Sequence, residues 1–345
     1  MTTVRFIFAI SILVFTVPSC QEMNILSGEV EAFYEVNMVM RLNYHFPVGG
    51  NPEIRLIREE TSPAIQTNNS VFRDSVLNND VRIEIGNIRI KDGAGAYRIM
   101  EFEQWEYREG KWVTDSETED TTITAKTLDL VLLLDASRSL NDSNFKLLQT
   151  NAIGFVMRIF EESDSARIAV AGFSDNITHS KFYEEKDIAQ IMSFINQRLP
   201  RGGRTILYEA MDSSLTLLER FSQADGRALV TFTDGRNNKW TEERFSTSEH
   251  IRNRIKQLER NTTVFYSSFI IGFLGDDGID ETILNSLTTK DGLFAVAKTQ
   301  SDAAFIFQRF ASIVPAIYRF IYTRNTSHTY GEPIRLKYTF RVWLL

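Results

Sequence analysis

Two patterns of apolar and polar residues divide the chain. Between residues 22 and 126, short runs alternate apolar and charged side chains, as in residues 81–85 (VRIEI) and 88–90 (IRI). Such alternation is typical of strands that expose one face to water. Residues 105–113 (WEYREGKWV) predict a hairpin with Glu109 and Gly110 at its turn. We therefore expect a small antiparallel β-sandwich in this part of the chain.

From residue 127 the pattern changes to strands and helices that follow one another. Residues 128–134 (LDLVLLL) form an almost continuous apolar run, which is typical of a strand buried on both faces of a parallel sheet. Further strands are predicted at residues 167–173, 228–233, 264–273 and 293–297, and helices at 143–160, 186–198, 206–221 and 248–260, from 281, and from 301 to about 315. This order predicts an α/β fold, with a doubly wound, mainly parallel sheet flanked by helices.

The last residues return to the alternating pattern. Residues 334–342 (IRLKYTFRV) alternate without interruption, and residues 320–323 (FIYT) are the predicted hairpin partner. This tail has one apolar face and no obvious place in the parallel sheet, so we expect it to pack with the N-terminal β domain. The predicted order is a signal peptide (1–19), a β-sandwich-like domain (20–126), the α/β domain (127–318) and a C-terminal β-hairpin (319–345).

The first twenty residues have the features of an export signal. Arg5 precedes an apolar run at residues 6–15, which is too short to span a bilayer, and small residues follow. The run leads to residues 17–20 (VPSC), and Cys20 is the only cysteine of the chain. This ending resembles the lipobox of bacterial lipoproteins, which implies lipidation at Cys20 and a membrane-anchored lipoprotein of the cell envelope, at the outer membrane or cell surface. The alternative is an ordinary signal peptide with an incidental cysteine.

Charge excludes one large class of partner. The chain carries 38 Lys and Arg against 45 Asp and Glu, a formal net charge of −7. A nucleic-acid-binding protein needs a basic face to neutralise phosphates, so we expect no nucleic-acid partner.

Three segments place oxygen-bearing side chains at the ends of predicted strands. Asp135, Ser137 and Ser139 follow the first buried strand, Thr205 follows two glycines and an arginine, and Asp234 follows strand 228–233. In open α/β sheets, ligands bind beyond the carboxyl ends of the strands. Side chains with only oxygen donors suit a hard cation. The alternative is that Asp135 and Asp234 merely cap helices or loops and that the hydroxyls satisfy backbone groups.

These residues carry a resemblance to a known family. The D-x-S-x-S element, the glycine-preceded threonine and the T-D-G element make residues 128–314 similar to a von Willebrand factor type A (vWA) domain with its metal-ion-dependent adhesion site. The resemblance implies that Ser137, Ser139 and in some members Thr205 contact the ion, while Asp135 and Asp234 often act through water. It also implies Mg²⁺, with Mn²⁺ or Ca²⁺ as alternatives, and a protein ligand that donates a carboxylate to the metal.

The expected function is therefore binding, not catalysis. We expect a lipid-anchored envelope protein whose vWA domain binds a protein partner through the metal ion. The alternative is a structural scaffold subunit of an envelope or secretion assembly, in which the metal is secondary. A metal-dependent hydrolase is disfavoured, because no histidine or second carboxylate adjoins the metal motif as a base and no G-x-S-x-G motif is present.

Overall fold

Two β-sheets contain the sixteen strands that the structure describes. The structure is a computed structural model, and it describes residues 34–45, 53–61, 65–67, 72–77, 80–91, 96–114, 124–125, 127–234, 247–260, 264–273, 279–289, 292–324 and 334–344. The predicted signal peptide and Cys20 lie outside these residues. By their contacts, Phe33–Leu345 form one unit.

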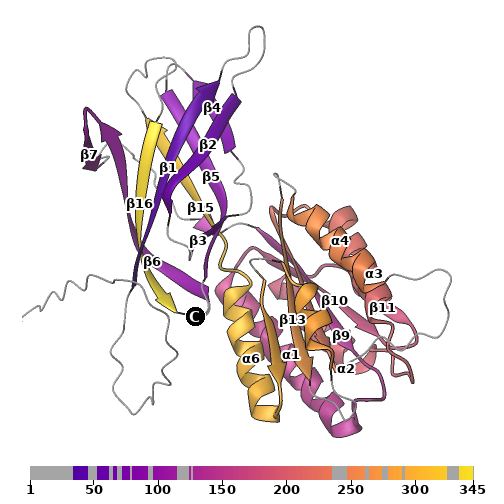
Figure 1. Cartoon of the computed structure of the whole chain (residues 1–345). Coiled ribbons are helices and arrows are strands. Elements are labelled where there is room, and N and C mark those ends of the chain that lie inside the picture. Colours follow the sequence, from indigo (N-terminus) through magenta and orange to yellow (C-terminus); the bar gives the residue numbers. More distant parts are fainter. Residues whose placement is uncertain are drawn as a thin grey trace, which may run out of the picture. The chain divides into compact units, whose positions relative to one another are not determined.

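The six-stranded sheet is parallel except at one edge, and its strand order is β11-β10-β9-β12-β13-β14 (Figure 1). Its strands are β9 (Leu128–Asp135), β10 (Ala166–Phe173), β11 (Ile177–His179), β12 (Gly226–Thr233), β13 (Phe265–Phe273) and β14 (Phe294–Ala297). The chain builds outward from β9 first to one side and then to the other. This strand order confirms the predicted doubly wound topology.

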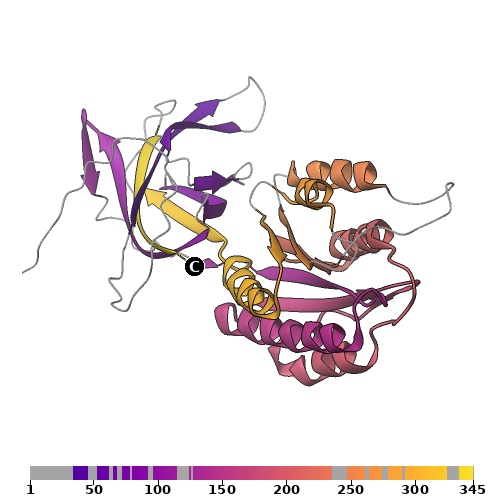
Figure 2. The ribbon, with the colours of Figure 1, turned by 60° about the horizontal axis from the view of Figure 1, so that its bottom comes forward.

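Helices cover both faces of this sheet, as Figure 2 shows. They are α1 (Asp142–Glu162), α2 (Ile188–Gln197), α3 (Leu207–Phe221), α4 (Ser248–Glu259), α5 (Glu281–Ser286) and α6 (Gln300–Ile313), with a 3₁₀ turn, η1 (Glu185–Asp187). Alternate residues of β9 pack on opposite layers. Leu132 lies in the core with α1, α2 and α6, whereas Leu133 lies in the core with α3, α4 and α5. This explains why β9 is apolar at almost every position. None of the described helices is long and apolar enough to cross a membrane.

Aromatic packing joins the end of β12 to α6. Phe232 and Phe307 stack with ring centroids 3.8 Å apart, and Phe155 of α1 meets Phe232 edge-on at 6.2 Å. Phe232 directly precedes Thr233, the last residue of β12. The carboxyl end of β12 is therefore held by a rigid core.

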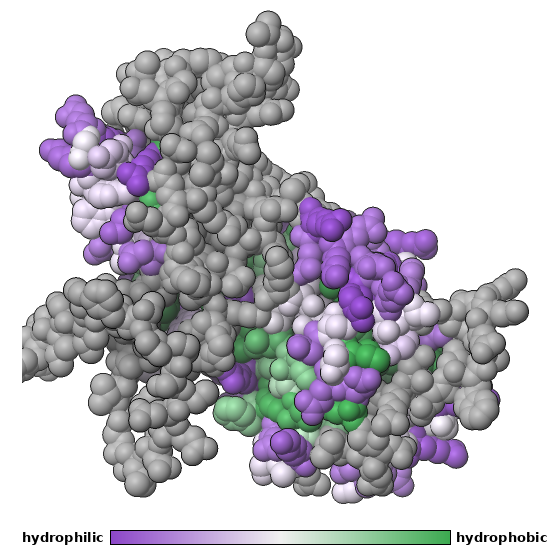
Figure 3. Space-filling view, viewed as in Figure 1, coloured by the Kyte–Doolittle hydropathy of each residue, from purple (hydrophilic) through white to green (hydrophobic). Residues whose placement is uncertain are grey.

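The outer surfaces of the helices differ in character. The face in Figure 3 is hydrophilic over α4 and apolar in the region of α6. On α6, Phe305 is 63% exposed. A single exposed aromatic residue is common on soluble proteins and assigns no function by itself.

The second sheet is antiparallel and has ten strands, with the order β2-β1-β16-β6-β5-β15-β8, while β3 and β4 also pair with β5 and β7 with β6. Its two halves meet where β5 and β6 pair: Ile90 lies opposite Tyr97, and Lys91 lies opposite Ala96. The predicted antiparallel β-structure is thus present. Its strands are β1 (Tyr34–His45), β2 (Glu53–Thr61), β3 (Ile65–Thr67), β4 (Phe72–Leu77), β5 (Asp80–Lys91), β6 (Ala96–Arg108), β7 (Lys111–Thr114), β8 (Thr124–Ala125), β15 (Tyr318–Arg324) and β16 (Ile334–Leu344).

The predicted hairpin between β6 and β7 is present. Arg108 pairs with Lys111 across a two-residue turn. Glu109 and Gly110 both have positive φ, 50° and 82°. A two-residue turn with positive φ at both positions matches the right-handed twist of the flanking strands, and glycine at the second position adopts this conformation without strain.

The predicted C-terminal hairpin of residues 319–345 is wrong. β16 lies between β1 and β6, whereas β15 pairs with β5 and β8, so the two tail strands are not neighbours. Both tail strands do pair with N-terminal strands, so the expected packing of the tail with the N-terminal β domain is present. The alternation of residues 334–342 specifies a strand with one buried face, but alternation carries no information about which strand lies beside it.

Candidate metal centre at the carboxyl ends of the parallel strands

Two loops lie side by side at the carboxyl end of β9. The first, residues 135–139, begins with the last residue of β9, and the second, residues 201–205, precedes α3. Ser137 forms a parallel bridge with Gly202, and the backbone N–H of Arg138 donates to the Gly202 carbonyl at 2.8 Å. This backbone pairing places the D-x-S-x-S residues next to the loop that carries Thr205.

Hydrogen bonds gather the side chains of the first loop. The Asp135 carboxylate accepts from the Ser137 backbone N–H at 2.9 Å and from the Thr233 hydroxyl at 2.9 Å. The hydroxyl oxygens of Ser137 and Ser139 are 2.7 Å apart. The structure therefore brings Asp135, Ser137 and Ser139 together and ties them to the end of β12.

The other two predicted residues reach the same edge by different routes. Asp234 directly follows β12 and is 4% exposed, and its charge acts on Asp135. Thr205 is 2% exposed, and its loop is joined to Ser137 through the backbone of Gly202. Of the five predicted residues, only Ser139 is exposed. A group bound here would be open to solvent on the Ser139 side.

The electrostatics of the centre favour a bound proton or cation. The pKa of Asp135 is raised from 3.8 to about 7, chiefly by burial and also by the nearby Asp234 carboxylate, although the hydrogen bonds from Ser137 and Thr233 oppose the shift. Two carboxylates held close together in a dry environment disfavour each other's ionised form. With three hydroxyls beside them, the donor set fits a hard divalent cation. Among the described residues, no group of three or more His, Cys, Asp or Glu side chains is placed to hold a metal.

Sequence reasoning missed two side chains at this edge. Asp175, after β10, accepts a hydrogen bond from the Gly203 backbone N–H at 3.0 Å. Arg201 donates to backbone carbonyls of the D-x-S-x-S loop, including that of Ser137 at 2.8 Å. The position of Asp175 after a buried strand was a usable signal. Nothing in the sequence distinguishes Arg201 from an ordinary loop arginine.

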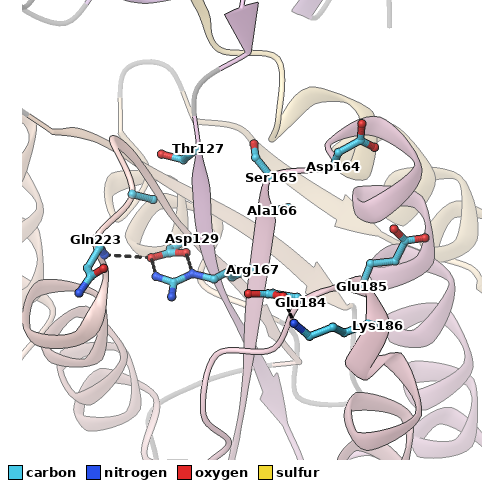
Figure 4. Close-up of a pocket in the computed structure, with 11 residues that line it drawn as sticks. Thr127, Asp129, Asp164, Ser165, Ala166, Arg167, Glu184, Glu185, Lys186 and Gln223 are labelled. Carbon is cyan, nitrogen blue, oxygen red and sulfur yellow. Dashed lines mark hydrogen bonds and ion pairs between the residues drawn. The ribbon is translucent and has the colours of Figure 1, made fainter.

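A second polar cavity lies at the other end of the same strands, where β9 and β10 begin (Figure 4). Its volume is about 550 Å³. Asp129, 1% exposed, accepts two hydrogen bonds from Arg167 at 2.6 and 2.7 Å, and Lys186 pairs with Glu184 at 2.6 Å. These four side chains form two ion pairs, and none of the predicted metal residues lines the cavity.

The α/β part of the chain matches a known protein family. The family model described as von Willebrand factor type A domain matches residues 129–313, more than half of the chain. No curated protein sequence matches the chain closely enough to count as a relative.

Several solved structures are similar. Proximal thread matrix protein 1 from the mussel byssus is 18% identical, with a TM-score of 0.45 over 60% of this chain and 50% of that one. That protein has also been solved with zinc in its metal-ion-dependent adhesion site (MIDAS) motif. The present chain thus spans about half the length of that protein. The vWF domain of the type V pili tip protein Mfa5 from Porphyromonas gingivalis is 13% identical, with a TM-score of 0.43 over 55% of this chain and 95% of that one. The pilus adhesin SpaC from Lactobacillus rhamnosus GG is 10% identical, with a TM-score of 0.46 over 80% of this chain and 51% of that one.

Proposed function

The chain belongs to the von Willebrand factor type A domain family, and we propose that it binds a protein ligand through a divalent metal ion. Mg²⁺ is the proposed ion, with Mn²⁺ and Ca²⁺ as alternatives. The observation that carries the proposal is the buried Asp135 carboxylate beside the clustered hydroxyls of Ser137 and Ser139, next to a second buried carboxylate. The proposed ligand set is Asp135, Ser137, Ser139, Thr205 and Asp234.

The chemistry of the ligand set supports binding rather than catalysis. The five proposed side chains, three neutral hydroxyls and two carboxylates, leave at least one of the six coordination positions of Mg²⁺ free. Because Ser139 is exposed, that position would be accessible to a partner on the Ser139 side. A carboxylate of a protein partner is the complementary ligand for a hard cation.

Exposed arginines beside the centre support an acidic partner. Arg138 lies between Ser137 and Ser139 and is exposed, and among the described residues its side chain makes no ion pair. Arg204 directly precedes Thr205, is 70% exposed, and has its Nε 4.0 Å from an oxygen of Asp175. Exposed cations around a binding site attract acidic surfaces and repel basic ones. The proposed ligand therefore presents further acidic residues beside the carboxylate that meets the metal.

The location of the protein is also part of the proposal. Residues 5–20 support export and lipidation at Cys20, and hence a membrane-anchored envelope lipoprotein. These residues lie outside the described part of the chain. Under this proposal the lipid provides the contact with the membrane, and the vWA domain provides the contact with the protein partner.

Calorimetric titration with Mg²⁺ and Mn²⁺ tests the metal. The parent should bind one ion, and Asp135→Ala should bind none, because the variant loses a charged ligand at the end of β9. Asp164→Ala is the matched control, since Asp164 is exposed and lines the cavity at the opposite end of the strands. If the parent binds no ion at millimolar concentrations, the metal function is wrong.

Capture of partners from an envelope extract, with and without EDTA, tests the binding function. Metal-dependent binding predicts that EDTA and Asp135→Ala both release the same partner. A partner that stays bound in EDTA and binds Asp135→Ala equally well would support the scaffold alternative.

A further inference from the structure

Arg201 joins the two loops of the candidate metal centre. From the second loop, its guanidinium donates to the carbonyl oxygen of Ser137 at 2.8 Å and to that of Leu140 at 3.0 Å. It also reaches the Asp142 carboxylate at 3.2 Å. Its central carbon lies 4.3 Å from the centroid of the Phe145 ring. One side chain thus contacts the D-x-S-x-S loop and the first turn of α1 at once.

These contacts hold the backbone that presents the hydroxyls. Ser137 and Leu140 lie between the end of β9 and the start of α1. Regular secondary structure therefore supplies few N–H donors for their carbonyl oxygens. A guanidinium has five N–H donors in a rigid plane and satisfies several such acceptors together. Stacking on Phe145 further restricts the orientation of that plane.

We propose that Arg201 is a positioning residue of the metal centre. Through the Ser137 and Leu140 carbonyls, it holds residues 137–140 so that the Ser137 and Ser139 hydroxyls stay beside Asp135. Arg201 acts through this backbone and does not itself touch the ion. The proposal rests on the metal-binding function proposed above, and it names a residue outside the five-residue motif.

A role in positioning and a purely electrostatic effect of Arg201 predict opposite changes in metal affinity when its charge is removed. A positive charge near a cation site opposes cation binding, so removing that charge should strengthen metal affinity if charge is its only contribution. If Arg201 positions the loop, its removal should weaken affinity despite the lost repulsion. Arg204 provides the matched control, because it lies in the same loop, is 70% exposed, and makes one ion pair at 4.0 Å.

The experiment is a Mn²⁺ titration of the full chain by calorimetry, well below the melting temperature of each variant. Arg201→Gln should weaken Mn²⁺ binding about 10-fold or more, as losses of outer-shell support typically do. Arg201→Lys keeps the charge but lacks the planar fork, so it should lie between Arg201→Gln and the parent. Arg204→Gln should bind Mn²⁺ as tightly as the parent, or more tightly. Parent-like or tighter binding by Arg201→Gln would overturn the proposal.

Hydrogen exchange in the metal-free protein separates this proposal from the metal function. The Arg138 amide, which donates to the Gly202 carbonyl, should exchange faster in Arg201→Gln than in the parent, while amides of β13 keep their rates. Unchanged exchange at Arg138 would show that Arg201 does not hold the loop, whatever the metal result. A parent that binds no Mn²⁺ would instead overturn the metal function itself.

Discussion

Arg89 of β5 donates a hydrogen bond through Nη2 to the backbone carbonyl oxygen of Val314, at 2.7 Å. Val314 is the C-terminal cap of α6, and Arg89 Nε also lies 3.4 Å from the carbonyl oxygen of Ala316. The last carbonyls of a helix have no partner within the helix. A cation at this end also interacts favourably with the helix dipole.

The surroundings of Arg89 explain how a guanidinium is tolerated in the interior. Arg89 is 0% exposed, and its remaining donors include one to the Ser267 hydroxyl at 3.3 Å. Its central carbon lies 5.4 Å from the Phe265 ring centroid and 5.2 Å from that of Phe269. An arginine of the antiparallel sheet thus completes the end of a helix of the α/β fold.

Replacing Arg89 should be costly. Arg89→Met keeps an apolar stem but leaves the Val314 and Ala316 carbonyls without their donor, so the free energy of unfolding should fall by roughly 3 kcal/mol. Urea unfolding of the metal-free protein measures this. Arg335→Met is the control: Arg335 also lies over two rings, at 5.2 and 5.3 Å, but is only half-buried, and the change should cost less than about 1 kcal/mol. Equal losses in the free energy of unfolding would show that the buried hydrogen bonds of Arg89 add no more stability than the contacts of Arg335 with its two rings.

The two adjacent glycines at positions 202 and 203 should respond differently to alanine. A Cβ at Gly202 would lie 2.6 Å from the Ser174 hydroxyl and would clash with the Asp175 carboxylate, whereas a Cβ at Gly203 would meet no atom within 4 Å. Gly202→Ala should therefore destabilise the protein by about 1–3 kcal/mol, the usual cost of overpacking. It should also weaken Mn²⁺ binding, because the displaced loop carries Thr205. Gly203→Ala should leave melting temperature and affinity unchanged, and the reverse order would contradict the geometry.

The stability of the metal-free protein should fall as pH rises. The pKa of Asp135 is raised from 3.8 to about 7, chiefly by burial, so between these pH values the folded state holds a proton that the unfolded chain has lost. Its contribution to stability is therefore present at low pH and is lost as pH rises toward about 7. Asp135→Asn should flatten this dependence and raise the melting temperature above that of the parent at pH 8. Melting curves in EDTA between pH 5 and pH 8 measure both effects, and identical slopes would contradict the assigned shift.

Removing the C-terminal strand should damage the antiparallel sheet more than the α/β fold. β16 pairs with β1 on one side and β6 on the other, and it buries Leu336, Tyr338 and Phe340. Deleting residues 326–345 takes away this interior strand and leaves the edges of both neighbours unpaired. Limited proteolysis with mass spectrometry should find early cuts in β1 and β6 while the parallel strands stay protected. Equal protection of both sheets would contradict this.

The lipid anchor predicts a change in maturation. Cys20→Ser removes the thiol that would carry the lipid, so the variant should leave the detergent phase and lose the mass of the acyl chains. Detergent partitioning and intact mass of parent and variant measure this in a bacterial host. Unchanged partitioning and processing would support the ordinary signal peptide.

Local sequence signals determined the α/β topology and the candidate ligands. The apolar run of residues 128–134 indicates a strand buried on both faces, because helices cover both faces of an interior strand in a parallel sheet. Asp135 ends such a strand and Asp234 directly follows one, so their position at one sheet edge follows from topology. The turn at Gly110 was likewise readable, because a two-residue hairpin demands positive φ.

The tertiary structure decided what depends on distant partners. The separation of β15 from β16 follows from pairing with strands more than 200 residues earlier, and alternation is the same whichever strand lies alongside. Arg89 and Arg201 both donate to backbone carbonyls, which every residue possesses. Their acceptors therefore have no sequence signature, and only the folded chain determines which carbonyls each guanidinium reaches.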